Sequence, residues 1–240
     1  MCQFFSFVTK GSKKYYFNWD QRQELLKSNP KYYSPDSHTS ICDYHNLNDD
    51  KVNKYEYNPL TKKFITDQIN IKDNQALAKK WVESLDFKTI VKPLVLKTIK
   101  HPFRDFDKVD VGSEQIQLLK EWASVRASVR ASVWASVGAS VWASVWASVR
   151  SSVGESVWDS VRAYVGESVG DSVKAYTSSF IVLEKWEYIE HKKGVNPFQS
   201  CIDLWDQGLV PSFDGKIWRL HSGEKADIVY EISAEKLKNL

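Results

Sequence analysis

The feature that most constrains how this chain can fold is a four-residue repeat that runs without a gap from Ala123 to Lys174. All thirteen tetrads carry Val at the third place, and all but the one that contains Tyr164 carry Ser at the second. The first place is mostly Ala, then Glu or Asp, and the fourth varies among Arg, Trp, Gly and Lys. A period of four fits two kinds of regular structure, a helix and an extended chain.

In a helix, four residues advance by about 400°, so a row of residues at every fourth place drifts by about 40° per tetrad. The valines would therefore wind once around a straight helix in about nine tetrads, and no fixed face would be apolar. Ser, Val and Gly also cost about 0.5–1 kcal/mol each in a helix relative to Ala. A long helix or a helical hairpin is the alternative prediction, and the helix predicted for SEQIQLLKEW directly before the repeat supports it.

In an extended chain, the first and third places share one face and the second and fourth share the other. Ala and Val would then always point inward, and the variable fourth residue would always point outward. Val, being β-branched, also favours strands. Because one strand of 52 residues cannot lie in a compact protein, the chain would have to coil. The first prediction for the repeat is therefore a β-solenoid-like element.

The small-x-apolar order of each ASV unit resembles pentapeptide-repeat proteins. In that family a small residue and a Leu two places later point into a four-sided coil. The tetrad has one residue fewer per side. The resemblance implies a coil, and the 16-residue spacing of Gly138, Gly154 and Gly170 predicts that, with four tetrads per coil, the fourth-place residues form columns on its outside.

The sequence on both sides of the repeat predicts an α+β body. The runs QFFSFVT and KKYYFNW predict one hairpin, and the segment around Asn58–Thr61 predicts the turn of a second. TIVKPLVLKTI is predicted as a buried strand broken by Pro93, FQSCIDLWDQGL as a helix, and the segment around Asp214 and Gly215 as another hairpin. The predicted organisation is an N-terminal α+β domain, a linking helix, the repeat element and a C-terminal α+β block, at residues 1–110, 111–122, 123–174 and 175–240.

A second resemblance covers the whole chain. It is carried by the tetrads and by the segments MCQFFSFVTKG, DKVNKYEYNPLTKKF and GLVPSFDGKIWRLHSG. With these segments the chain resembles uncharacterised phage or mobile-element proteins that contain runs of SVW, SVR and SVG tetrads. The resemblance implies no fold or activity, but it is consistent with a phage accessory factor that acts on a host macromolecule.

Composition limits the function classes further. With 42% hydrophobic and 13% aromatic residues, the chain is expected to fold, and a net charge of +3 is too small to argue for nucleic acid by itself. Three unclustered cysteines predict a reducing compartment. No run of about 18 apolar residues is present, so we expect no membrane association and a cytoplasmic location, in the host cytoplasm if the protein is phage-encoded. We expect no cofactor, because the common nucleotide and metalloprotease motifs are absent.

The variable fourth place supplies the candidate binding residues. Trp and Arg dominate binding hot spots in protein interfaces, and they also stack on bases and contact phosphates. Acidic residues such as Glu155 and Asp159 in the second half of the repeat favour a protein partner, or a second copy, over single-stranded nucleic acid. Alternatively, the tryptophans only cover the repeat beneath the flanking blocks. The candidates are Arg126, Arg130, Trp134, Trp142, Trp146, Arg150, Trp158 and Arg162.

Two residue sets suggest an enzyme or a small-ligand binder in the N-terminal domain. Cys2 would carry its own α-amine as a base if Met1 were removed, as in N-terminal nucleophile enzymes. His38, Cys42 and His45 fall on one helix face and could form part of a zinc site, although no fourth ligand is evident. The favoured prediction is a non-enzymatic binding or assembly protein. The alternatives are this enzyme or ligand binder, or a binder of single-stranded nucleic acid.

Overall fold

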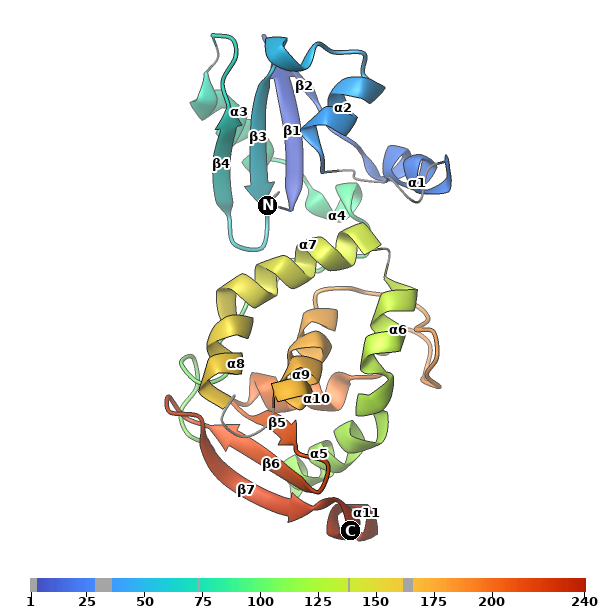
Figure 1. The fold of residues 1–240 in the computed structure, drawn as a ribbon, viewed down its shortest axis with the longest axis vertical. Helices are drawn as coiled ribbons and strands as arrows, with labels where there is room; N and C mark the ends of the chain where they lie inside the picture. Colours follow the sequence, from blue (N-terminus) through green and yellow to red (C-terminus); the bar gives the residue numbers. More distant parts are fainter. Residues whose placement is uncertain (1–3, 29–35, 73, 138, 162–165) are drawn as a thin grey trace. The chain divides into compact units, whose positions relative to one another are not determined.

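The structure is a computed structural model, and it divides the chain into two compact units, Met1–Thr98 and Ile99–Leu240. Each unit is described by itself below (Figure 1). The residues that the structure describes are 4–28, 36–72, 74–137, 139–161 and 166–240. No helix among them is both long enough and apolar enough to cross a lipid bilayer.

The N-terminal unit is built on an antiparallel sheet with strand order β2-β1-β3-β4. Both hairpins predicted from the sequence are confirmed, since β1 pairs with β2 and β3 pairs with β4. Gly11 in the first turn has φ +61°, a conformation that glycine adopts without strain. The elements are β1 (Phe5–Lys10), β2 (Lys13–Tyr15), α1 (Trp19–Ser28), α2 (His38–Tyr44), η1 (Asp49–Lys51), β3 (Asn53–Asn58), β4 (Lys63–Gln68), α3 (Gln75–Glu83) and α4 (Phe87–Ile90).

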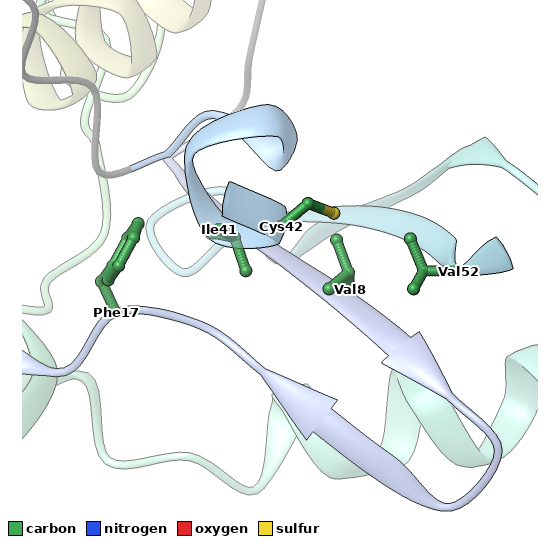
Figure 2. Close-up of a cluster of buried hydrophobic side chains, with 5 residues drawn as sticks. All are labelled: Val8, Phe17, Ile41, Cys42 and Val52. Carbon is green, nitrogen blue, oxygen red and sulfur yellow. The ribbon is translucent and has the colours of Figure 1, made fainter. Parts of the chain in front are cut away.

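Successive strand residues point to opposite sides of this sheet, and helices cover both of its faces. Figure 2 shows one face, where a buried cluster joins β1 to α2. On the other face the ring of Phe7 lies 4.9 Å from that of Trp81 in α3, and Phe5 lies 5.2 Å from Phe87 in α4. The cluster in Figure 2 consists of Val8, Phe17, Ile41, Cys42 and Val52.

The buried strand predicted for TIVKPLVLKTI is wrong. The segment begins in α4, whose first turn is capped by the Asp86 carboxylate accepting from the Lys88 N–H at 3.0 Å. It then passes through a turn at Pro93 and continues without regular pairing apart from one bridge at Leu94. Proline cannot donate to a strand ladder, which explains why the apolar run does not extend into a strand.

The C-terminal unit combines helices with a three-stranded antiparallel sheet of order β5-β6-β7. The predicted helix over FQSCIDLWDQGL and the hairpin at Asp214 and Gly215 are confirmed as α10 and the β5–β6 turn. The elements are α5 (Ser113–Val125), η2 (Arg126–Ser128), α6 (Val129–Ser136), α7 (Ala139–Val149), a π-helical segment η3 (Arg150–Gly154), α8 (Glu155–Val161), α9 (Gly166–Ser178), α10 (Gln199–Asp206), β5 (Val210–Phe213), β6 (Ile217–Ser222), β7 (Asp227–Ser233) and α11 (Ala234–Asn239).

The β-solenoid-like element predicted for the repeat is wrong, because the described part of the repeat is helical. It is not one straight helix, however. α6, α7 and α8 follow one another around the central helix α9 (Figure 1), which consists largely of the last tetrads. The helical path is interrupted by η2, by extended backbone at Val137 (φ −103°, ψ 120°) and by η3.

These interruptions explain how a drifting row of valines can stay inside. Over the two or three tetrads of one short helix the drift amounts to about 80° at most, which still fits an apolar face about 100° wide. Each interruption then redirects the chain, so that the next valines again face inward. Among the valines of the repeat that the structure describes, only Val125 and Val141 are half-buried and the others are buried. The buried ones are Val129, Val133, Val137, Val145, Val149, Val153, Val157, Val161, Val169 and Val173.

Several second-place serines are compatible with helix because their hydroxyls find acceptors, whereas the buried hydroxyl of Ser132 has no hydrogen-bond partner among the described residues. Ser148 and Ser160 donate to the carbonyls four residues earlier, both at 2.8 Å. Two serines of α9 also form hydrogen bonds with strand β5. Ser172 donates to the Pro211 carbonyl at 2.8 Å, and Ser168 accepts from the Phe213 N–H at 2.7 Å. Tertiary contacts such as these override the weak helix propensity of the repeat.

Candidate binding groove in the repeat

A groove of about 560 Å³ opens between α9 and the continuous stretch formed by α7, η3 and α8. All the described residues that line it belong to the repeat, and six of these nine occupy the fourth place of a tetrad. The fourth-place residues are Trp146, Arg150, Gly154, Trp158, Gly170 and Lys174. The other three are Glu155, Asp159 and Val173.

Two glycines bring the helices close together beside the groove. A β-carbon on Gly170 would lie 2.9 Å from Cζ3 of Trp158, which is closer than real side chains approach. A β-carbon on Gly154 would lie 3.3 Å from Cγ1 of Val173. Glycine at these fourth places therefore allows the Trp158 ring to lie against α9.

The groove carries charges of both signs. Arg150 Nε lies 3.5 Å from Glu155 Oε1, and both side chains are well exposed. Lys174 Nζ lies 3.0 Å from Asp171 Oδ1, and the other oxygen of Asp171 accepts from Arg126. Asp159 forms no salt bridge with another described residue. Because the exposed pair is weak, both of its members remain available to a ligand.

The structure brings three of the candidate binding residues, Trp146, Arg150 and Trp158, to this groove. Trp142 is 9% exposed and stacks on Trp146, with ring centroids 5.9 Å apart and 23° between the planes. Trp142 thus supports one wall of the groove, a role that agrees with the covering function considered for the tryptophans.

The remaining candidates lie elsewhere. Arg126 donates to Asp171 at 2.7 Å and lies 5.5 Å over the Phe213 ring, so it joins the repeat to the sheet. Arg130 and Trp134 are exposed on α6, and 72% of the surface of Trp134 is accessible to solvent. Arg162 lies outside the described residues.

The proposed zinc ligands do not converge. His38 Nε2 donates to the Tyr55 carbonyl at 3.0 Å, and its Nδ1 lies 3.3 Å from Asp67. Burial, followed by the neighbouring Asp49 carboxylate, raises the pKa of the Cys42 thiol to about 11, which disfavours the thiolate that binds metals. His45 packs against aromatic rings. In the described ranges no three His, Cys, Asp or Glu side chains are placed to hold a metal ion.

Nucleophilic chemistry finds little support in the described residues. Cys2, the proposed N-terminal nucleophile, falls outside them. Ser212 and His221 do form a hydroxyl–imidazole pair at 2.8 Å, and His221 Nδ1 donates to the Ala226 carbonyl at 3.1 Å. Both side chains are 0% exposed, however, so no substrate can reach the hydroxyl. The pair joins β5 to β6 and is structural.

Sequence reasoning named the fourth-place residues but missed how they meet. The roles of Gly170 and Lys174 depend on α9 lying beside α8, which a period of four does not reveal. Comparisons with models of protein families, with curated proteins and with solved structures found no match for the chain. The groove is therefore interpreted from its own geometry.

Proposed function

We propose that this is a non-enzymatic binding or assembly protein whose groove in the repeat takes a segment of a protein partner. One observation supports the proposal above all others. The invariant third place of the tetrads builds the interior, whereas the variable fourth place supplies most of the groove lining. This division separates the residues that maintain the scaffold from those that select a ligand.

The chemistry of the groove favours a protein segment. Its volume falls within the roughly 300–1,000 Å³ typical of ligand sites. The indoles of Trp146 and Trp158 offer flat apolar contacts, and charged groups of both signs stand beside them. A peptide carries both kinds of charge. Single-stranded nucleic acid would bring a phosphate with every nucleotide toward Glu155 and Asp159, which costs electrostatic energy.

The sequence resemblance suggests a biological setting for such a groove, namely a phage accessory factor that occupies a host protein. This setting requires no catalytic step. It requires only that the groove be open to solvent, and the exposure of Arg150, Glu155 and Asp159 is consistent with that.

The proposal is tested by selecting displayed random peptides on the full chain and measuring the binding of the selected peptides by fluorescence anisotropy. We expect Trp158→Ala to weaken binding about tenfold or more, because truncation of a tryptophan hot spot has effects of this size. The matched control is Tyr188→Ala, which removes an aromatic ring that is 75% exposed outside the groove lining. Circular dichroism verifies that each variant is folded.

A second groove variant, Glu155→Lys with Asp159→Lys, keeps the test valid if Trp158→Ala does not fold. Both carboxylates are exposed, so this reversal of charge should leave the fold intact. Failure to enrich any peptide would contradict the proposal, as would peptides that bind every groove variant as tightly as the wild type. Salt-sensitive binding of an oligonucleotide in the groove would instead favour nucleic acid.

A further inference from the structure

We infer that the groove receives helix α6 of a second copy of this chain, inserted through Trp134, so that the protein self-associates head to tail. The inference rests on the proposed function and specifies the protein segment that the groove takes. It assigns a role to the most exposed tryptophan of the repeat, which the groove itself does not use.

Trp134 is the exception among the fourth-place tryptophans. It exposes 72% of its surface, whereas Trp142 exposes 9%, and Trp146 and Trp158 are half-buried. A large aromatic side chain this exposed is costly to leave in water and marks interaction surfaces when polar residues surround it. Arg130 stands one turn earlier on α6 and is exposed as well, so the two side chains share a helix face.

The groove offers this face aromatic rings and two carboxylates, beside the cations Arg150 and Lys174. Indole rings prefer offset-stacked or edge-to-face contacts with other aromatic rings, and Trp146 and Trp158 both line the groove. Glu155 and Asp159 lie one helical turn apart, about 6 Å, which is also the spacing along the axis between Arg130 and Trp134. An indole placed between the groove tryptophans would therefore bring a guanidinium within reach of a carboxylate.

A chain cannot fill its own groove in this way. α6 and α8 flank α9 from opposite sides (Figure 1), and each packs against it. Trp134 is on α6, whereas the groove lies between α9 and the stretch of α7, η3 and α8, so α9 separates α6 from the α8 side of the groove on one unit. A contact between two unlike surfaces is heterologous, so each added copy leaves one free groove and one free Trp134 at the ends. The expected assemblies are rings or open chains rather than symmetric dimers.

The experiment is sedimentation velocity on the full chain over a range of concentrations. We expect the wild type to form oligomers beyond the dimer as concentration rises. Trp134→Ala should raise the apparent dissociation constant about tenfold or more, and so should Glu155→Lys with Asp159→Lys. Tyr188→Ala is the control and should assemble like the wild type.

Mixing the two defective variants gives the sharpest result. Trp134→Ala retains a groove, and the charge-reversed variant retains Trp134, so an equimolar mixture should form a 1:1 dimer and nothing larger. A wild type that stays monomeric at its highest soluble concentration overturns the inference, as does a mixture that remains monomeric or a Trp134→Ala variant that assembles with the dissociation constant of the wild type. None of these results affects peptide binding by the groove, so the proposed function would fail or stand separately.

Discussion

The indole of Trp158 fills the space that a side chain on Gly170 would need, with Cζ3 of the ring 2.9 Å from the position of the missing β-carbon. The two residues occupy the fourth place of different tetrads, one in α8 and the other in α9. The tryptophan of α8 thus packs against the glycine of α9, and the two residues hold equivalent places in their tetrads.

This relationship predicts that Gly170→Ala has opposite effects in two backgrounds. In the wild type, displacing the Trp158 ring should cost about 1–3 kcal/mol and outweigh the gain of up to about 1 kcal/mol in helix propensity. With Trp158→Ala already in place, nothing obstructs the β-carbon, and Gly170→Ala should stabilise the protein. Urea denaturation of the four proteins of this double-mutant cycle measures the coupling. Equal effects in both backgrounds would show that the ring does not press on this glycine.

Val157 and Val141 should respond differently to truncation although both hold the third place. Val157 is 0% exposed, whereas Val141 is half-buried. Val157→Ala should lower the free energy of unfolding by about 2 kcal/mol, less the few tenths that Ala gains in helix propensity. Val141→Ala should cost less than about half of that. Equal losses, measured by denaturant unfolding, would contradict the arrangement of valines described here.

Arg126 and Arg130 form a second matched pair one helical turn apart in sequence. Arg126 bonds to Asp171 and lies over the rings of Phe213 and Trp218, whereas Arg130 is exposed. We expect Arg126→Ala to destabilise the fold by about 1–2 kcal/mol, from a partly buried ion pair and cation–π contacts. Arg130→Ala should change stability by less than about 0.5 kcal/mol. Thermal unfolding compares the two variants directly, and a larger loss for Arg130→Ala would be inconsistent with the structure.

Stability should fall in mild acid because burial lowers the pKa of His221 and of His101. As the pH drops below about 6.5, these two histidines become protonated in the unfolded chain but stay neutral in the folded protein, so the free energy of unfolding decreases. The contribution is complete above that pH and is lost progressively below it. Eight of the ten tryptophans lie in the C-terminal unit, so their fluorescence follows its unfolding.

The control for this pH dependence is His221→Gln, which keeps a side chain able to donate and accept but removes the titrating ring. Its stability should fall less steeply between about pH 6.5 and pH 5 than that of the wild type. A variant with an unchanged slope would show that His221 is not protonated on unfolding in this range.

Local signals explain which parts of the fold could be predicted. The turn at Gly11 and the one at Asp214 and Gly215 are short-range, and both hairpins form where the sequence indicates them. The run around Pro93 misled because apolar composition alone does not distinguish a strand from an irregular buried segment.

The repeat shows the limit of such reasoning more clearly. Burial of the valines could be inferred from their invariance within the tetrads, and it holds for most of them. The secondary structure of the repeat could not be inferred in this way. Its helices are stabilised by packing against α9, and α9 is itself formed by the last tetrads of the repeat. The groove has the same origin. Trp146, Arg150 and Trp158 could be named as candidate binding residues, but their convergence with Gly170 depends on the bends at Val137 and η3.

The winding of α6, α7 and α8 around α9 also restricts how the gene can change. In an open solenoid, extra units would simply lengthen the stack. Here one additional tetrad between η3 and Trp158 would turn Trp158 by about 40° relative to Gly154 and displace it by about 6 Å, so that the two residues could not both keep their contacts with α9. Replication slippage that adds a tetrad at this position should therefore disrupt the packing of α8 against α9 and be selected against.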